Sequence, residues 1–452
     1  MAPTARSAPS WPDRPATEVL HALARGELSV ERYAAALLER VDEVEPRVQA
    51  WAWLDRAAVL EQAREADRLR GRAGVAGPLA GLPVGVKDII DVRGMPTEDG
   101  TVLHAGRVAV RDAALVRRLR DAGAWPMGKT VTTELATYAP GKTRNPHDPA
   151  HTPGGSSSGS AAAVAAGMVP LAVGTQTNGS VIRPASFCGV VGFKPTFGLL
   201  ARRGALQQSA PLDHIGVFAR SVGDAALLAQ ALAGADPDDP AGPTPLPAAH
   251  WIGGGPGAPP TLAIVRTPFW DRVDAGAREA FDALVAMLGE RARPLDLPRS
   301  SVDAVTWHRT IMEADIAASF EAEYEQGRDR LSASLRGQIE RGRAVTLVDY
   351  RRALARRATL ADRIDALFDD IDAIVTPATL GAAPAGLEST GDPLMCTLWT
   401  LTGAPALSLP LLRVGGLPLG VQLVGRRHDE ARLLRAARWL EHAAGGGAAA
   451  SA

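Results

Sequence analysis

The stretch from Pro153 to Ser180 constrains the fold of this chain more than any other segment. It opens with PGGSSSGS and continues directly into an Ala-rich run, residues 161–166, that ends at Gly167. A Gly/Ser run is typical of a linker, but one that leads straight into apolar helix-forming residues predicts a tight loop docked on a buried helix. A second loop, residues 174–180 (GTQTNGS), follows an apolar strand-like run at 168–173. The chain must therefore fold so that two Gly/Ser loops flank one buried helix.

This combination of residue types points to acyl chemistry. Glycines let neighbouring backbone N–H groups turn toward a common point, where they can stabilise an oxyanion. A small hydroxyl among them places a nucleophile beside that oxyanion. The two loops therefore predict a site for acyl transfer.

Composition narrows the classes of function. The formal net charge of −1 over 452 residues leaves no electrostatic footprint for nucleic acid or an anionic membrane. Cys188 and Cys396 are too few for a disulfide framework and lack the spacing of a metal site. Residues 1–15 have no apolar signal-peptide core, and no stretch reaches the length of a membrane span. We expect a cytoplasmic protein with no nucleic-acid partner and no membrane.

Lysine is rare in this chain, and its positions are informative. Only four of the 49 basic residues are lysines: Lys87, Lys129, Lys142 and Lys194. Where arginine is the usual cation, a retained lysine can do what arginine cannot, such as lose its proton when buried. Lys87 lies in an apolar strand pattern, GLPVGVKDII, so its lowered pKa would make it a base near neutral pH. The alternatives are an ion pair with Asp88 or a chance survival of codon bias.

Strand-like and helix-like segments alternate along the chain, which predicts an α/β fold. His147 and His151 are four residues apart, but no acidic or His partner stands in HExxH register, so we expect no metal site. We expect one domain over 1–452 with the following parts: N-terminal helices at about 16–70, a catalytic core at 71–235, a Pro/Gly-rich loop at 236–260, the remaining sheet with a helical pocket wall at 261–441, and a disordered tail at 442–452.

Five motifs together resemble the amidase signature family: GLPVGVKDII around Lys87, PGGSSSGSAAAVAAG around Ser156, GTQTNGSVIRPASFCGVVGFKPT around Ser180, VTPAT at Val375, and GLPLGVQLVGRRHDEARLLRAARWLE near the C-terminus. The resemblance spans roughly Thr17 to Glu441. It implies a single amidase domain with a mixed central β-sheet covered by helices on both faces. It also implies cofactor-free hydrolysis through a Ser–Ser–Lys triad.

The resemblance assigns roles by position. Ser180 matches the nucleophile, Ser156 the serine that follows a cis peptide bond, and Lys87 the base. A serine hydroxyl needs a base close by, and a neutral lysine can serve while a second serine passes the proton. The same amine can then return the proton to the leaving nitrogen. The backbone N–H groups that match the oxyanion hole are those of Thr177, Asn178, Gly179 and Ser180.

The chain departs from the family pattern at two places. The usual Asp-Thr-Gly-Gly-Ser run is replaced by Gln176–Ser180, and the commoner SSGGS by Ser156–Ser160. Asn178 adds a side chain where glycine is usual, which could narrow the oxyanion loop or donate a hydrogen bond to substrate. Arg183, three residues past Ser180, could pair with a substrate carboxylate or could hold the loop through carbonyls or a carboxylate.

Three other interpretations compete with this one. Residues 155–159 fit GxSxG, the nucleophile elbow of an α/β-hydrolase, with Ser157 as nucleophile and Asp213 or His428 downstream. A phosphate-binding loop is disfavoured because the run lacks the GK[ST] ending. The third is that the chain is the ammonia-releasing A-type subunit of a tRNA-dependent amidotransferase complex. The chain shows no basic face for tRNA, so another protein of the complex would have to supply it.

The substrate has no readable code in the sequence. We expect a small-molecule amide or a carbamate, the latter as in a urethanase. The sequence does not separate acyl from amine specificity, and a homodimer remains open.

Overall fold

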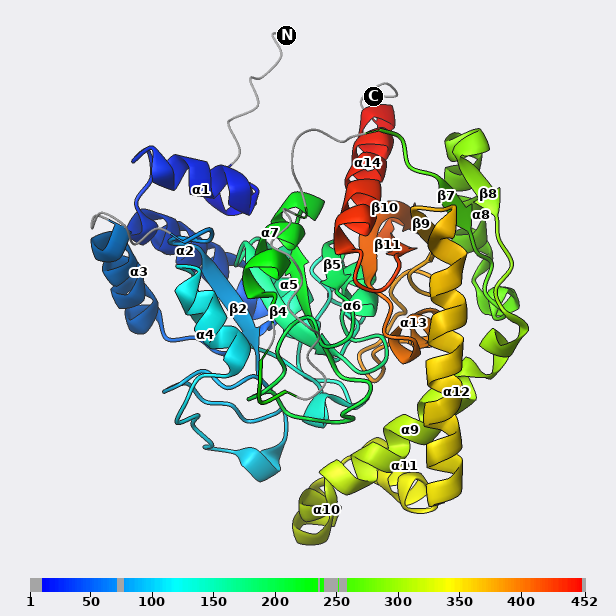
Figure 1. The fold of residues 1–452 in the computed structure, drawn as a ribbon. Coiled ribbons are helices and arrows are strands. Elements are labelled where there is room, and N and C mark those ends of the chain that lie inside the picture. The colour runs from blue at the N-terminus through cyan, green and yellow to red at the C-terminus, as the bar shows by residue number, and fades with distance from the viewer. Residues whose placement is uncertain (1–9, 71–76, 235, 240–250, 252–257, 449–452) are drawn as a thin grey trace.

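The computed structural model describes residues 10–70, 77–234, 236–239, 251 and 258–448, and Figure 1 shows its fold. Within that part of the chain, eleven strands form one mixed sheet in the order β1-β3-β2-β4-β6-β5-β10-β11-β9-β7-β8. The strands are β1 (Trp51–Trp53), β2 (Pro83–Lys87), β3 (Trp125–Thr130), β4 (Leu171–Gln176), β5 (Val191–Lys194), β6 (His214–Ala219), β7 (Leu262–Ile264), β8 (Ala292–Pro294), β9 (Ala373–Pro377), β10 (Ala406–Val414) and β11 (Leu417–Val424).

The two ends of the sheet contain its parallel pairs. Strand β2 runs parallel to β3 and β4, and β7 runs parallel to β8 and β9. The strands between β4 and β9 pair antiparallel, with Ala172 opposite Phe218 in β4 and β6 and Leu407 opposite Leu423 in β10 and β11. The sheet is therefore mixed, as the sequence predicted.

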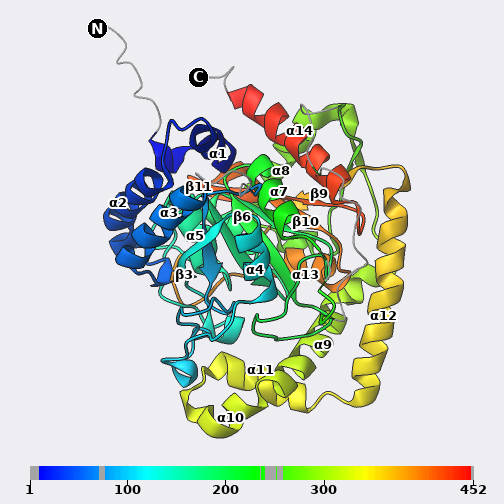
Figure 2. The same ribbon diagram turned by 60° about the vertical axis from the view of Figure 1, so that its left-hand side comes forward.

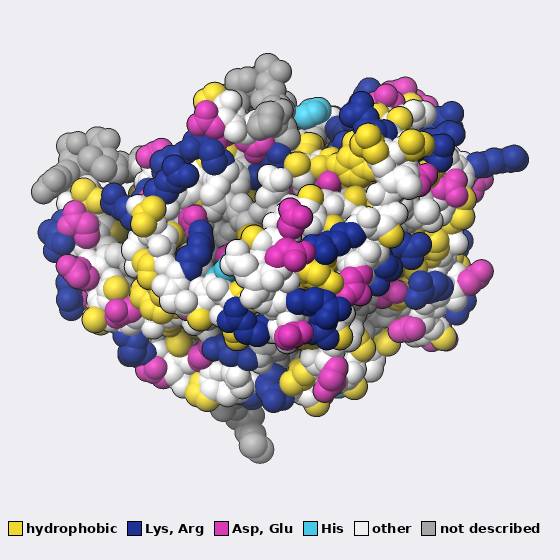
Figure 3. All heavy atoms as spheres, turned by 90° about the horizontal axis from the view of Figure 1, so that it is seen from below, with side chains coloured by type: hydrophobic (Ala, Val, Ile, Leu, Met, Phe, Trp, Pro, Cys, Tyr) yellow, Lys and Arg dark blue, Asp and Glu magenta, His cyan; other side chains and the backbone are white. Residues whose placement is uncertain are grey.

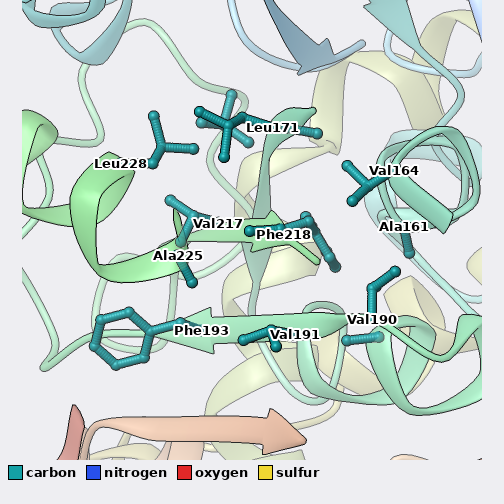
Figure 4. Packing of buried hydrophobic residues seen from close by; sticks show 14 of the residues in the cluster. Ala161, Val164, Leu171, Val190, Val191, Phe193, Val217, Phe218, Ala225 and Leu228 are labelled. Atoms are coloured by element: carbon teal, nitrogen blue, oxygen red, sulfur yellow. The ribbon is translucent and has the colours of Figure 1, made fainter. Parts of the chain in front are cut away.

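Helices cover both faces of this sheet. They are α1 (Ala16–Ala24), α2 (Val30–Val48), α3 (Arg56–Arg70), α4 (Ala114–Asp121), α5 (Ser158–Ala165), α6 (Ile182–Cys188), α7 (Val222–Leu232), α8 (Ala275–Leu288), α9 (Ala304–Ser319), α10 (Glu321–Gly327), α11 (Ala333–Arg343), α12 (Leu347–Asp365), α13 (Leu394–Leu401) and α14 (Glu430–Ala448). Figure 4 shows the core between them: Phe218 of β6 points toward Ala161 of α5, whereas Val217 points toward Ala225 of α7. Helices α5 and α7 thus pack on opposite faces, which confirms the predicted architecture.

Helix α5 is the buried helix that the two Gly/Ser loops flank. Its residues from Ser158 to Val164 are all buried, so small side chains are needed on every face. At Gly159 a Cβ atom would lie 2.3 Å from the carbonyl oxygen of Ala50 and from the nitrogen of Val131. Glycine therefore lets α5 approach β3 closely. The helix starts at Ser158, a little earlier than the run at 161–166 indicates.

Several segments differ from the sequence-based expectation. The N-terminal helical region contains three helices and the short strand β1, because Gln49 adopts a left-handed conformation (φ 55°) and ends α2. Helix α6 ends at Cys188, where Gly189 (φ 68°) supplies the left-handed cap. Helix α14 continues to Ala448, into the segment predicted to be a tail. Most of the predicted loop at 236–260 lies outside the described residues.

The segment predicted as a helical pocket wall forms α9 to α12. These helices gather at the lower right of Figure 1, away from α1–α3, and the turned view in Figure 2 keeps the two groups apart. On the face seen from below in Figure 3, basic and acidic side chains are interspersed and form no large area of one sign. Of the helices that the structure describes, none combines the length and apolar character that crossing a membrane requires.

Candidate active site

Lys87 ends strand β2 with its side chain fully buried. Its Nζ atom donates to Ser156 Oγ at 2.7 Å and to Thr175 Oγ1 at 2.8 Å. Burial lowers the pKa of Lys87 well below its usual value, and the nearby negative charge of Asp213 opposes that shift only in part. The amine is thus close to two hydroxyl groups in an environment that favours its neutral form.

The predicted ion pair between Lys87 and Asp88 is absent, because Asp88 binds a different lysine. Lys129 Nζ lies 3.0 Å from Asp88 Oδ1 and also donates to Thr97 Oγ1 at 2.6 Å. Asp88 lies in the turn that follows β2, and its carboxylate is occupied by Lys129. The structure therefore removes the ion-pair alternative for Lys87.

Among the four serines of the first loop, the hydroxyl of Ser156 is the one that meets Lys87. The peptide bond between Gly155 and Ser156 is cis, as the resemblance implied. The other three hydroxyls donate to carbonyl groups of the neighbouring strands or the residues that follow them: Ser157 to Thr175, Ser158 to Val131 and Ser160 to Val173. Three serines therefore fasten helix α5 to the sheet, and one faces the amine.

Strand β4 extends to Gln176, so the second Gly/Ser loop is reduced to Thr177–Ser180. This loop lies between β4 and α6 and is held by its carbonyl groups. Each of its four carbonyl oxygens accepts a hydrogen bond from outside the loop. The pairs are His308 Nε2 to Thr177 O (2.8 Å), Thr400 Oγ1 to Asn178 O (2.5 Å), Arg183 N to Gly179 O (2.9 Å) and Ser157 N to Ser180 O (3.4 Å).

The N–H groups of the same loop are left free. Among the described residues, none accepts a hydrogen bond from the N–H groups of Thr177 to Ser180, whereas the next two, of Val181 and Ile182, both donate to Gln176 Oε1 at 2.7 and 3.0 Å. Backbone N–H groups in folded proteins are nearly always paired, so four consecutive free donors mark a place for an acceptor. These four donors belong to the loop that ends at Ser180, so they are available to an acceptor bound there.

Gln176 occupies the position where the family pattern has Asp, and it makes hydrogen bonds of two kinds. The side-chain amide accepts with Oε1 and donates with Nε2, which lies 2.9 Å from Thr400 Oγ1. Thr400 then donates its own proton to the carbonyl of Asn178. A carboxylate can only accept, so glutamine is the residue that can join the helix N-terminus to this threonine.

Arg183 is fully buried and binds the loops. Its Nη2 and Nε atoms donate to the carbonyl oxygen of Gly155 at 2.7 and 3.2 Å, and its Nη1 donates to the carbonyl oxygen of Gly391 at 2.6 Å. These contacts match the carbonyl-holding alternative that the sequence left open. They fix the backbone immediately before Ser156.

Two ionisable residues that the sequence analysis did not assign to the triad site support the loop. Burial raises the pKa of Asp213 to about 6, although Thr177 Oγ1 and the N–H groups of Ser209 and Gln208 donate to its carboxylate and oppose the shift. Burial lowers the pKa of His308 to about 4, so the neutral ring donates through Nε2 to Thr177 O. No local sequence pattern connects either residue to the loop, since they lie far from it along the chain.

Three cavities adjoin one another near Ser180, which lines the middle one. The middle one, with a volume of about 240 Å³, is lined by Ser180, Tyr138 and Met312, among others. It shares Thr177 and Gln208 with a cavity of about 690 Å³ that Thr175 and Asp213 also line. On its other side it shares Tyr138, Asn178 and Met312 with an outer cavity of about 670 Å³.

The nucleophile-elbow alternative is not assembled in this structure. Ser157 Oγ, which is buried, donates to Thr175 O at 3.1 Å and accepts from Thr175 N at 3.3 Å. The carboxylate of Asp213 accepts from Thr177 Oγ1 at 2.6 Å, and for His428 the contact is made by its backbone N–H, which donates to Thr196 Oγ1. The Ser157 hydroxyl and the Asp213 carboxylate that an elbow would need therefore have other partners.

The two histidines of the preceding loop differ in their contacts. His147 Nε2 donates to the carbonyl oxygen of Cys188 at 2.9 Å, whereas His151 Nδ1 lies 2.9 Å from an oxygen of Asp148 without the geometry of a hydrogen bond. Across the part of the chain that the structure describes, no three His, Cys, Asp or Glu side chains group so as to hold a metal ion.

Comparisons of the sequence and the fold with known proteins identify the family of this chain. The family model described as Amidase matches residues 32–434. A curated relative, the A-type subunit of the glutamyl-tRNA(Gln) amidotransferase of Chloroflexus aggregans, is 36% identical over 92% of this chain and 93% of its own length. The peptide amidase of Stenotrophomonas maltophilia superposes with a TM-score of 0.82 at 29% identity, covering 96% of this chain and 98% of that one.

A further solved structure, reported as a vestigial protein complex that reveals the origins of an s-triazine catabolic enzyme, gives a TM-score of 0.88 at 30% identity, covering 95% of this chain and 98% of that one. Sequence and structure agree over nearly the whole length of these proteins. The chain therefore belongs to the amidase signature family, whose enzymes act on carbon–nitrogen bonds.

Proposed function

We propose that this chain is a serine amidohydrolase that cleaves the C–N bond of a carboxamide through an acyl-enzyme on Ser180. One arrangement carries the proposal: a buried lysine bonded to Ser156, next to a loop whose four N–H groups are free beside Ser180. The donors serve the oxyanion of a tetrahedral intermediate, and the lysine serves as the base. We propose Thr177, Asn178, Gly179 and Ser180 as the oxyanion donors.

The proposed reaction uses two serines and one amine. Neutral Lys87 accepts the proton of Ser156, which accepts the proton of Ser180 as the Ser180 oxygen bonds to the substrate carbonyl carbon. The protonated Lys87 returns its proton through Ser156 to the leaving nitrogen, and the C–N bond breaks to release ammonia or an amine. Water then attacks the acyl-enzyme, loses its proton along the same route and restores the Ser180 hydroxyl. A carbamate would react by the same steps.

Arg183 acts in this proposal as a positioning residue. Its guanidinium is occupied by the carbonyl groups of Gly155 and Gly391, so we assign it to holding the Ser156 loop rather than to binding a substrate carboxylate. Removing one partner of a buried charged group leaves the other partners unsatisfied. Arg183→Lys would lose the forked geometry and is expected to disturb Ser156.

A second candidate function rests on the curated relatives. The identity to the A-type subunit of a glutamyl-tRNA(Gln) amidotransferase, 36% over 92% of this chain, supports a role as the ammonia-releasing component of an amidotransferase complex. The chemistry at Ser180 would be the same in both roles. Assay of the purified chain alone separates them: steady ammonia release from simple amides favours the free enzyme, and release only after addition of partner proteins favours the role in a complex.

Labelling and substitution test the assignment of the nucleophile. An activated fluorophosphonate should modify Ser180, which mass spectrometry of the labelled peptide will locate. Ser180→Ala should lose about 10³-fold or more in kcat, because a triad fails as a unit. Ser156→Ala should be severe but leave some turnover, since a water can occupy the vacated position. Ser157→Ala is the matched control and should be milder. An adduct on Ser157 with an active Ser180→Ala variant would refute the proposal.

A further inference from the structure

Asn178 lies on the boundary between two of the three cavities. The Ser180 cavity and the outer cavity share Tyr138, Asn178 and Met312. Asn178 Nδ2 donates to the hydroxyl of Tyr138 at 3.2 Å, and Thr397 Oγ1 donates to Asn178 Oδ1 at 2.8 Å. The amide is thus held at both ends across the boundary.

The transfer of protons through Ser156 and Lys87 indicates on which side of Ser180 the acyl group lies. The leaving nitrogen must reach the proton that Ser156 and Lys87 supply, so it lies on their side of the Ser180 oxygen. Of the described residues, those lining the Ser180 cavity include neither Ser156, Lys87 nor Thr175. The cavity that Tyr138 and Asn178 border is therefore left for the acyl group.

We propose that Asn178 and Tyr138 form a partition that restricts the acyl group to short chains. The inference rests on the proposed function and adds a substrate class to it: amides of small carboxylic acids. The Ser180 cavity, about 240 Å³ including its open mouth, has little more than a third of the roughly 670 Å³ of the outer cavity measured in the same way. On this side of Ser180 a long acyl chain therefore finds room only beyond the partition.

The partition is a feature of this chain's own sequence. Glycine, the usual residue at this position in the family pattern, would leave no amide to reach Tyr138. Because Asn178 is also anchored by Thr397, the side chain cannot swing aside without losing two hydrogen bonds. A chain that extends past the partition must therefore displace a fixed side chain.

The test measures chain-length preference. We would follow ammonia release from acetamide, propionamide, butyramide, hexanamide and octanamide by the wild type, Asn178→Gly and Tyr138→Ala. The second variant opens the same boundary without changing the sequence of the oxyanion loop and removes one side-chain hydrogen bond to Asn178, so agreement between the two variants assigns the effect to the partition. Val305→Ala, which enlarges the outer cavity away from the partition, is the control.

A misfit methylene in a tight pocket costs roughly 10- to 200-fold in kcat/KM. We expect the wild-type kcat/KM to fall at least about tenfold between butyramide and hexanamide. Both partition variants should raise the ratio of hexanamide to acetamide by about tenfold or more, and Val305→Ala should leave the ratio unchanged.

The outcomes separate this inference from the proposed function. A wild type that is labelled at Ser180 by a fluorophosphonate but hydrolyses long and short amides equally, or none of the short ones, overturns the partition alone. A ratio that stays unchanged in both partition variants does the same. A wild type that is not labelled at Ser180 overturns the proposed function itself.

Discussion

Thr400→Val tests whether the oxyanion loop is positioned through its carbonyl groups. The Thr400 hydroxyl is buried, accepts from Gln176 Nε2 at 2.9 Å and donates to Asn178 O at 2.5 Å. Valine has nearly the same shape and removes only the hydroxyl. The Asn178 carbonyl then loses its anchor, while the side chains of the proposed triad are unchanged.

The expected magnitude follows from what is left unpaired. Both Gln176 Nε2 and Asn178 O lose this partner, and each buried unpaired group costs about 1–3 kcal/mol, so the free energy of unfolding should fall by about 2–6 kcal/mol. Deleting one oxyanion donor costs about 10²–10³ in kcat. Thr400→Val displaces a donor without deleting it, so we expect kcat to fall by about 10- to 100-fold.

Thr402→Val is the matched control. This buried hydroxyl lies two residues further along and donates to the carbonyl oxygens of Leu398 and Trp399 within the same helical segment. The Leu398 carbonyl keeps a backbone N–H donor in the variant, so the loss of stability should be small. Both variants would be compared by urea unfolding and by steady-state kinetics on one amide.

The result that would refute this reasoning is a Thr400→Val enzyme that unfolds cooperatively and keeps kcat within about threefold of Thr402→Val. Such an enzyme would place its donors correctly without the Thr400 anchor. A rise in KM at constant kcat would also contradict it, because uniform binding and not transition-state stabilisation would then have been lost.

Three further predictions concern the base. Lys87→Arg keeps the charge but cannot lose its proton, so its kcat should fall about 10²–10⁴-fold below that of the wild type, as low as that of Lys87→Ala. Substantial activity in the arginine variant would show that Lys87 has only a structural role. In the wild type kcat/KM should rise with pH as Lys87 deprotonates. Because the carboxylate charge of Asp213 raises the pKa of Lys87, Asp213→Asn should move this rise to lower pH. A rise at unchanged pH would exclude an electrostatic effect of Asp213 on Lys87. Ammonia release should survive exhaustive dialysis against EDTA, and a loss that a divalent cation restores would contradict a lysine base.

Site residues that lie in contiguous motifs are predicted well from the sequence. Ser156 lies in a Gly/Ser run before an apolar helix, and Lys87 lies in an apolar strand, so both positions are visible locally. The mixed sheet follows from the same alternation together with the family resemblance. The β10–β11 hairpin is harder to predict, because its first strand, Ala406–Val414, has an apolar pattern that a single sequence does not separate from a buried helix.

The sequence does not show how the oxyanion loop is held. His308 and Thr400 reach its carbonyls from 131 and 222 residues away, and neither lies in a pattern that differs from ordinary helix residues. Periodicity reports which face of a helix is buried, not which backbone atom a buried hydroxyl will meet. The role of Gln176 was hidden for the same reason, since its partner Thr400 belongs to another helix.

Burial alone does not identify the base among the lysines. Lys87, Lys129 and Lys194 are all fully buried, and burial lowers the pKa of each, to about 7 for Lys194. Lys129 binds the Asp88 carboxylate, and Lys194 donates to the carbonyl oxygen of Ala404 at 2.6 Å. These acceptors cannot give a proton back to an amine.

The two hydroxyls around Lys87 differ from those acceptors, because a hydroxyl can accept from an ammonium and donate to a neutral amine. Proton transfer needs a partner that is stable on both sides of the exchange. The chemical type of the acceptor, and not the depth of burial, therefore distinguishes a base from a structural cation in this fold. A search for catalytic lysines in related chains should accordingly start from buried amines that face only hydroxyl groups.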